Sequence, residues 1–328
     1  MKLSVVTTLY YSQNYVREFH RRVVSSILKI TDQYEIIFVN DGSPDGSLQR
    51  VLELQRTDPN VLVVDLSRNF GHHKAIMTGL RFAQGDYVFL IDVDLEEDPE
   101  LLDRYWAELR ASEGVDVVFG IQKKRKGGFF ERASGRIFYG LFSLLAAIEY
   151  PHDTLTARLM TKRYVAKVIS YRETELDIWG LFVLTGFNQK GVYATKGSKG
   201  TSTYTLKKKL KMAIETITSF SSRPLYLIFL FGVFIIIAAF ANILFIIYKK
   251  LLYGVAVEGW ASLLTTIWLV GGIIIFLLGV IGIYLSKMFT EIKNRPFTIV
   301  REVYGRENAG AGNRSDQLNP ISDAGQNR

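Results

Sequence analysis

Cysteine is absent from this 328-residue chain, and histidine occurs only four times. Without cysteine the protein can form no disulfide, no thiolate nucleophile and no cysteine-ligated zinc site. The four histidines have no spacing typical of metal ligands, which argues against a histidine metal site. The chain also lacks a G-x-G-x-x-G sequence after its first apolar run and lacks a Walker sequence. Dinucleotide-binding and P-loop folds therefore have little support.

Charge is absent from two long stretches in the C-terminal half. The first, 225–248, has 24 residues without a charge, and the second, 259–286, has 28. At a rise of about 1.5 Å per residue, a helix of either length exceeds the ~30 Å hydrocarbon core of a bilayer. We therefore predict two transmembrane helices, joined by an external loop over 249–258, rather than core helices of a soluble domain.

Basic residues flank this pair of stretches on the outer sides, whereas the connecting loop carries only Lys249 and Lys250. The positive-inside rule then places both chain termini in the cytoplasm of a multi-pass protein of the cell membrane. We expect a cytoplasmic domain over 1–205, an amphipathic membrane-surface helix over 206–224, and a cytoplasmic segment over 287–328, disordered after about residue 305. The flanking basic residues are Lys207, Lys208, Lys209, Lys211, Arg223, Lys287, Lys293, Arg295 and Arg301.

The net charge is +8, with basic clusters at 123–128 and 206–211. Nucleic acid is one partner for such clusters, but a basic segment beside two membrane spans more simply meets anionic headgroups or a lipid phosphate. No interleaved aromatic residues mark a platform for base stacking. We therefore expect the lipid bilayer as a partner and no nucleic acid.

Short apolar runs recur in the first 121 residues, at 3–9, 35–41, 61–67, 86–92 and 115–121. Segments of helical periodicity separate them. Apolar strands that alternate with helices predict an α/β domain with a mostly parallel sheet covered on both faces. Ligands bind at the carboxyl ends of the strands in such sheets, so the residues that follow each run are candidates for the site.

Polar clusters follow three of these runs, at 40–43, 67–69 and 92–94. DGSPDGS on its own is a good turn sequence. Three clusters at one edge of the sheet favour a ligand site instead. Arg68 and Lys74 are basic residues near these clusters that would suit a diphosphate.

Carboxylates are crowded after the fourth run, at Asp92, Asp94, Glu96, Glu97, Asp98 and Glu100. Asp92 and Asp94 could flank one water as acid and base, or hold one hard cation such as Mg²⁺ or Mn²⁺. Glu97, Asp98 and Glu100 have a structural explanation. They lie where the next helix starts, and acidic residues suit the positive end of a helix dipole.

Four stretches, in this order and spacing, resemble the inverting family 2 glycosyltransferases with a GT-A fold: SVVTTLYYSQNY, VNDGSPDGS, LSRNFGHHKAIMTGL and IDVDLEEDPELL. More narrowly, they resemble the polyprenyl-phosphate sugar transferases, which include dolichyl-phosphate mannose synthase and the bactoprenol glucosyltransferases. The resemblance continues to about residue 305 through RASGRIFYGL, TARLM, GTSTYTLKKKLKMA, SFSSRPL, two spans and EIKNRPFTIV.

This resemblance implies roles for the polar clusters. Asp41 would accept hydrogen bonds from the base or ribose of a nucleotide sugar. Asp92 and Asp94 would bind nucleotide and metal, with Mg²⁺ or Mn²⁺ acting as a Lewis acid on the departing nucleoside diphosphate. The expected site for the nucleotide sugar comprises Asp41, Gly42, Ser43, Arg68, Asn69, Lys74 and Asp92.

The implied acceptor is a polyprenyl phosphate, which is mostly dianionic near pH 7 because its second pKa is about 6. Arg132, Ser134 and Arg136 match the family positions for this phosphate, although a solvated face of an amphipathic helix would also explain the two arginines. Two other family arginines are missing; Lys124 or Arg125 can stand in for one, and Lys196 or Lys199 for the other.

Asp153 and Arg158 complete the catalytic candidates. Many relatives have an acidic pair in a D-x-G-D-F-R-like stretch, and here Thr156 replaces the second acid. Asp153 can therefore act as a base or only position a substrate.

We expect a hexosyltransferase that moves glucose from UDP-glucose to undecaprenyl phosphate with inversion, in a homo-oligomer such as a tetramer. Mannose from GDP-mannose, galactose and aminoarabinose remain alternatives. A processive polysaccharide synthase is disfavoured because no Q-x-x-R-W sequence is present. An inactive membrane scaffold is disfavoured by the intact Asp41, Asp92, Asp94 and Arg158.

Overall fold

The computed structural model describes residues 1–122, 154–173, 177–195, 197, 218, 221–253 and 259–305. The chain divides into two units. The first is an α/β domain built from Met1–Gly128, Tyr150–Thr203 and Arg295–Arg328, and the second comprises Phe129–Glu149 and Tyr204–Asn294. The α/β domain is thus completed by residues that follow the second apolar helix in the chain.

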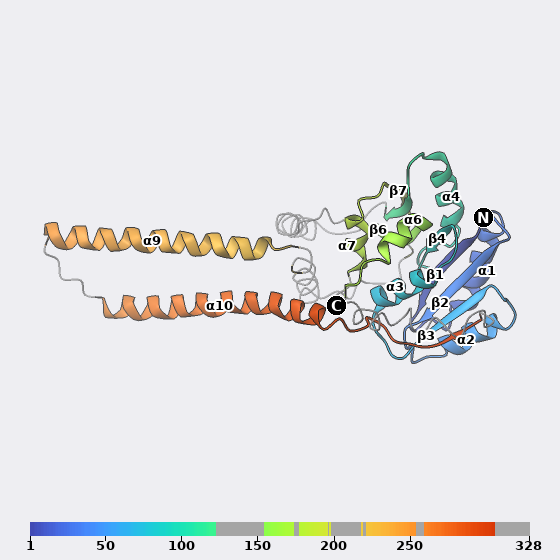
Figure 1. Ribbon diagram of the computed structural model, residues 1–328, viewed down its shortest axis with the longest axis horizontal. Helices are drawn as coiled ribbons and strands as arrows, with labels where there is room; N and C mark the ends of the chain where they lie inside the picture. The colour runs from blue at the N-terminus through green and yellow to red at the C-terminus, as the bar shows by residue number, and fades with distance from the viewer. Residues whose placement is uncertain are drawn as a thin grey trace, which may run out of the picture. The chain divides into compact units, whose positions relative to one another are not determined.

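An eight-stranded sheet forms the α/β domain, in the order β7-β5-β6-β4-β1-β2-β3-β8. Figure 1 labels β1, β2, β3, β4, β6 and β7 of this sheet. β1 pairs in parallel with β2 and β4, β2 with β3, and β5 with β7, whereas β6 and β8 are antiparallel to their neighbours. The predicted α/β class with a mostly parallel sheet is confirmed. The strands are β1 (Leu3–Leu9), β2 (Tyr34–Asn40), β3 (Val61–Leu66), β4 (Tyr87–Leu90), β5 (Val117–Gln122), β6 (Thr154–Thr161), β7 (Gln189–Ala194) and β8 (Val300–Tyr304).

Helices cover both faces of the sheet because its central strands are apolar on both. On one face, Leu3 and Val5 of β1 join a buried cluster with side chains of α1, α2 and α4. On the other face, α3 packs so closely that a Cβ on Gly79 would lie 2.5 Å from Cγ1 of Val6. The helices are α1 (Val16–Ile27), α2 (Ser47–Gln55), α3 (His72–Phe82), α4 (Leu101–Ala111), α6 (Lys162–Val168) and α7 (Ile178–Leu184).

The edge strand β8 is a feature that the sequence analysis does not predict. It pairs with β3 in antiparallel direction, from Val63 opposite Tyr304 to Leu66 opposite Val300. The pairing carries the chain from the second apolar helix back to the sheet, at the edge opposite β7. The sheet edge at β3 is therefore covered by a strand from the C-terminal part of the chain.

The second unit contains two long helices, α9 (Arg223–Tyr253) and α10 (Trp260–Ile292). Both are long and apolar enough to cross a membrane, and their apolar windows are not buried in the protein. α9 contains the whole first predicted span and continues five residues past it, into the predicted loop, to Tyr253. α10 contains all but the first residue of the second predicted span and continues six residues past it, to Ile292. Most of the surface helix predicted over 206–224 lies outside the described residues.

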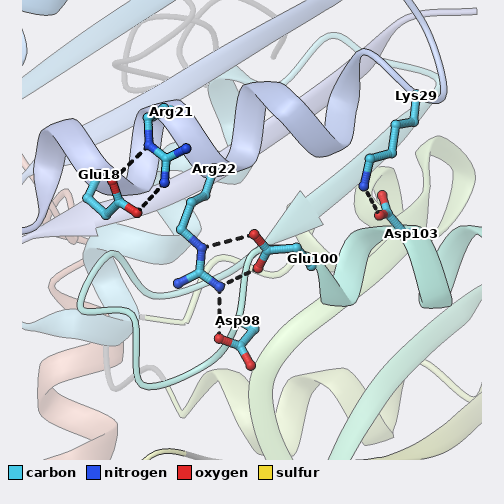
Figure 2. A network of polar contacts seen from close by, with 7 residues as sticks. All are labelled: Glu18, Arg21, Arg22, Lys29, Asp98, Glu100 and Asp103. Carbon is cyan, nitrogen blue, oxygen red and sulfur yellow. Dashed lines mark hydrogen bonds and ion pairs between the residues drawn. The ribbon is translucent and has the colours of Figure 1, made fainter.

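Arg22 of α1 fixes the loop that leads into α4 (Figure 2). Its guanidinium pairs with both carboxylate oxygens of Glu100 and also contacts Oδ1 of Asp98 at 2.9 Å. The neighbouring Arg21 pairs with Glu18 on the same helix. The hydrogen bond from Arg22 lowers the pKa of Glu100 from its ordinary value of 4.5. Two of the crowded carboxylates thus have a structural partner.

Arg22→Ala is expected to lower the free energy of unfolding by about 1 kcal/mol, allowing for the exposure of both carboxylates. Since the pKa of Glu100 is lowered, this contribution is present above about pH 4.5 and is lost as the pH falls through the folded-state pKa. Denaturant unfolding at pH 7 and at about pH 3 measures both effects. The exposed Arg21→Ala change is the matched control and should have no measurable effect. Equal effects of the two changes at pH 7 would contradict the assignment.

Candidate functional site

The polar clusters that follow β2 and β3 are in direct contact. The carboxylate of Asp41 is 3% exposed and accepts hydrogen bonds from the backbone N–H groups of Phe70 (2.7 Å) and Gly71 (3.0 Å). These two backbone N–H groups lie just before α3, where the helix itself offers no acceptor, so Asp41 satisfies their hydrogen bonds. Asp41 therefore fixes the course of the loop between β3 and α3.

Gly42 allows the two loops to approach each other. Its φ is +58°, and a Cβ there would lie 2.5 Å from the backbone carbon of Arg68 and the backbone nitrogen of Asn69. Glycine adopts such a φ without a steric penalty, and it leaves room for the neighbouring backbone. The guanidinium of Arg68 lies over the ring of Phe70, at 4.3 Å from its centroid.

Ser43 connects the loop after β2 to the loop after β1. Its hydroxyl accepts a hydrogen bond from the N–H of Tyr11 (2.8 Å) and donates one to Asp45 (2.6 Å). Burial raises the pKa of Asp45, but hydrogen bonds from Ser43, Ser47 and the N–H of Gln13 outweigh it, and the net shift is downward. Asp45 thus stays ionised and holds the turn together.

Asp92 and Asp94 follow β4 at the same edge of the sheet. Oδ1 of Asp92 lies 3.4 Å from Nε2 of His72, whose Nδ1 lies 3.2 Å from the hydroxyl of Thr8. Oδ1 of Asp94 accepts a hydrogen bond from the N–H of Glu96 at 3.0 Å. The end of β1, the start of α3 and the residues after β4 therefore meet at His72.

His72 is a site residue that the sequence analysis missed. Histidines were considered there only for the spacing of metal ligands. The available signal was the position of His72 in the LSRNFGHHKAIMTGL stretch, directly after a polar cluster that follows a strand. Residues at the first turn of the following helix lie at the carboxyl edge of the sheet.

The turn that carries the two aspartates is strained. Leu95, which follows Asp94, has a φ of +60°, an uncommon conformation for a residue with a branched side chain. Strained backbone of this kind is often found at ligand sites. Asp92 and Asp94, before this turn, are partly exposed, whereas Glu97, two residues after Leu95, is buried.

The donor atoms at this edge fit a hard divalent cation. Asp92 and Asp94 are both partly exposed, so their oxygens are accessible. Mg²⁺ and similar ions are usually held by one or two carboxylates, with phosphates and water completing the coordination. The described part of the chain holds no cluster of three or more acidic or histidine ligands. A cation here would therefore need oxygens from a bound substrate.

Glu97 has a different structural role from the predicted one at the start of a helix. It is 1% exposed, and its oxygens accept hydrogen bonds from the N–H groups of Thr156 (3.0 Å) and Ala157 (2.6 Å) on β6. α4 begins only at Leu101. The helix-dipole explanation is wrong for Glu97, because two backbone donors of a neighbouring strand bind its carboxylate instead.

Arg158 lies on β6 and is 2% exposed. Its guanidinium carbon is 3.8 Å from the ring centroid of Phe182 and 4.7 Å from that of Trp179, both on α7. Its hydrogen bonds to the carbonyls of Leu155 and Thr156 are long, at 3.5 and 3.4 Å. A buried cation in contact with two aromatic rings of α7 is well placed to hold that helix against the sheet.

Lys74 is half-buried on α3, two residues after His72. The remaining predicted site residues lie outside the described residues. These are the catalytic candidate Asp153 and the acceptor-phosphate candidates Arg125, Arg132, Ser134, Arg136 and Lys199.

Known glycosyltransferases are similar to this chain over most of its length. Residues 4–169 match the family described as glycosyl transferase family 2. A protein of Mycobacterium tuberculosis whose name places it among glycosyltransferases is 47% identical over 94% of this chain and 90% of its own. The SfII prophage-derived bactoprenol glucosyl transferase of Shigella flexneri is 30% identical over 92% of this chain and 98% of its own.

Among solved structures, the mannosyltransferase PcManGT from Pyrobaculum calidifontis, in complex with GDP-Man and Mn²⁺, is 15% identical, with a TM-score of 0.45. The match covers 66% of this chain and 63% of that one. This similarity is too low to bear on the chemistry of the present chain.

Gly42→Ala is expected to lower the free energy of unfolding by about 2 kcal/mol or more, because a methyl group would meet the backbone of Arg68 and Asn69 at a φ that alanine disfavours. Gly46→Ala is the matched control in the same loop, since its Cβ would meet only the end of the flexible Gln13 side chain. Denaturant unfolding of both variants tests the contact. Equal stability of the two variants would show that the loops are not packed in this way.

Proposed function

The chain belongs to glycosyl transferase family 2 and is a glycosyltransferase, and on that premise we propose that it transfers glucose from UDP-glucose to a polyprenyl phosphate. The reaction inverts the anomeric configuration, depends on a divalent metal, and takes place at the cytoplasmic face of the cell membrane. The observation that carries this proposal is the pair Asp92 and Asp94 at the carboxyl end of β4, at the edge shared by the loops after β2 and β3.

The relatives and the two apolar helices support a lipid-linked acceptor. The bactoprenol glucosyl transferase of Shigella flexneri is similar over 98% of its own length, so the likeness includes the C-terminal half of both proteins. Two helices long enough to cross a membrane give this chain access to an acceptor whose tail is in the bilayer. The acceptor phosphate then lies where a cytoplasmic domain can reach it.

On the donor side, the loops bind and orient the nucleotide sugar. Arg68 and Lys74 supply positive charge for the diphosphate, and Asn69 offers an amide for hydrogen bonding. Asp41 holds the loop between β3 and α3, and the remaining lone pairs of its carboxylate can accept hydrogen bonds from the nucleoside. Asp92 and Asp94 would hold Mg²⁺ or Mn²⁺, which supplies Lewis-acid stabilisation of the departing diphosphate.

On the acceptor side, no strong base is required. A phosphate monoester is mostly dianionic near pH 7, because its second pKa is about 6. One of its oxygens forms the bond to the anomeric carbon while the bond from that carbon to the diphosphate breaks, and UDP leaves with the electron pair. Displacement on the face opposite the leaving group inverts the anomeric centre. Arg125, Arg132, Ser134, Arg136 and Lys199 are the proposed residues for binding and orienting the acceptor phosphate.

Asp153 and Arg158 have supporting roles in this proposal. Asp153 acts as a base or orients a substrate. Arg158 is buried and contacts the rings of Phe182 and Trp179, so it acts through α7 and the adjoining strands. The homo-oligomer and the cytoplasmic position of both chain termini are part of the same proposal, as is the choice of glucose over mannose, galactose or aminoarabinose.

The purified protein in detergent, given radiolabelled UDP-glucose, undecaprenyl phosphate and Mg²⁺, is expected to form labelled lipid. Chelation of the metal should abolish the product, and Asp94→Asn should reduce it about 100-fold or more. Asp98→Asn is the matched control from the same acidic stretch, since Asp98 contacts Arg22 rather than the site. It should retain nearly full activity.

Two results would contradict this assignment. Binding of UDP with metal but no labelled lipid would point to another donor, and GDP-mannose and UDP-galactose would be tried next. Absence of nucleotide binding under every metal condition would overturn the proposed donor site.

His72→Ala is expected to weaken metal-dependent UDP binding by about tenfold, because groups that orient a metal-binding carboxylate typically contribute that much. Calorimetric titration with UDP, with and without Mg²⁺, measures the effect. His20→Ala is the control, since His20 also pairs with an aspartate, Asp58, but does so outside the candidate site. A loss of UDP binding that is equal with and without metal would show that His72 does not act through Asp92.

A further inference from the structure

The segment that follows the second apolar helix reaches the candidate donor site. The N–H of Ser67, the first residue after β3, donates a hydrogen bond to the carbonyl of Ile299 at 2.9 Å. Ser67 directly precedes Arg68 and Asn69. The EIKNRPFTIV stretch singled out in the sequence therefore ends against a loop proposed to bind the donor.

The pairing of β8 with β3 contains an irregularity at one residue. Asp65 lies opposite Glu302 and Leu66 lies opposite Val300, so Arg301 has no partner on β3. An extra residue on one strand of an antiparallel pair is a β-bulge, and bulges change the direction of a side chain. The bulge is placed at the carboxyl end of β3, where the loop to α3 begins.

Arg301 joins two groups at this end of β3. One terminal nitrogen lies 3.3 Å from Oδ2 of Asp65, and the other donates to the carbonyl of Ser67 at 2.6 Å. Asp65 is 1% exposed, so its carboxylate depends on partners inside the protein. The guanidinium can make both contacts at once because its donors are fixed in a planar fork.

The contacts continue from Asp65 to the loop after β2. Oδ1 of Asp65 accepts a hydrogen bond from Nδ2 of Asn40 at 2.7 Å, and Oδ1 of Asn40 accepts one from the N–H of Ser43 at 3.3 Å. Asn40 immediately precedes Asp41. Arg301 is thus linked directly to the loop after β3, through the carbonyl of Ser67. It is linked indirectly to the loop after β2, through Asp65 and Asn40.

The same segment is also attached to α3. The hydroxyls of Thr298 and Thr78 lie 2.9 Å apart, and the guanidinium of Arg81 lies 4.2 Å from the ring centroid of Phe297. α3 carries His72 at its first turn. Residues 297–301 therefore contact β3, the loop after it and α3 directly, and they reach the loop after β2 through Asp65 and Asn40.

We propose that Arg301 is a positioning residue of the donor site, which sets the loops 40–43 and 67–69 in the arrangement that binds the nucleotide sugar. The segment after the second apolar helix then forms part of the donor site as well as covering a sheet edge. This inference rests on the proposed function, because it takes these loops as the donor-binding loops.

A purely structural role for β8 would use its backbone. An uncovered strand edge exposes unpaired N–H and C=O groups, and an added strand satisfies them regardless of its side chains. The side chain of Arg301 goes beyond this role by reaching Asp65 and Ser67. A substitution that retains the strand and the positive charge but removes the planar guanidinium distinguishes the backbone role of β8 from the side-chain role of Arg301.

Arg301→Lys is this substitution, and Glu302→Gln is its matched control on the same strand. Glu302 receives a hydrogen bond from the hydroxyl of Tyr304 and has no contact with the site loops among the described residues. The full-length protein in detergent is titrated with UDP and Mg²⁺ by calorimetry. Its KM and kcat for UDP-glucose are measured with undecaprenyl phosphate as acceptor.

We expect Arg301→Lys to raise the Kd for UDP and the KM for UDP-glucose roughly three- to tenfold, since one charged hydrogen bond is lost. The kcat should change little, and Glu302→Gln should behave like the unaltered protein. Unchanged Kd and KM in Arg301→Lys, with or without a lower unfolding temperature, would overturn the inference.

The unaltered protein distinguishes this outcome from failure of the proposed function. If it binds UDP and Arg301→Lys binds UDP equally well, only the role of Arg301 is refuted. If the unaltered protein binds no nucleotide, the donor site itself is refuted, and with it the role of Arg301.

Discussion

Parallel pairing of β4, β1, β2 and β3 is the constraint on which the candidate site depends. Because these strands run in one direction, the residues that follow them collect at one edge of the sheet. The apolar strands can be buried on both faces only if helices cover both, and the close packing of α3 through Gly79 brings His72 to the same edge. The fold thus assembles polar groups that are distant in the sequence without exposing the core.

In the acidic stretch after β4, neighbouring carboxylates have different roles because their surroundings differ. Glu97 is buried against backbone donors of β6, and Glu100 is paired with Arg22. Both have partners that compensate the cost of removing a charge from water. Asp92 and Asp94 instead lie at the partly exposed edge, where charge can be balanced by a ligand. As a result, one short segment supports both the domain and the proposed chemistry.

The sequence predicts the local features of this structure better than the distant contacts. Five apolar runs correspond to β1–β5, and two uncharged stretches correspond to α9 and α10, because period and hydropathy are properties of short windows. The bulge at Arg301 was not predicted, since its contact with Asp65 joins residues 236 positions apart. The orientation of His72 toward Asp92 was missed for the same reason, and Glu97 was assigned to a helix start because its partners lie on β6.

The position of β8 has a consequence for the order in which the protein is made. Residues 300–304 are synthesised after both apolar helices, so the growing chain has no β8 to pair with the edge of β3 until α9 and α10 have been produced. An uncovered strand edge is prone to pairing with other chains. Completion of the sheet therefore waits until both apolar helices and the segment after them have been synthesised, and a chain that ends before residue 300 would leave the edge of β3 open.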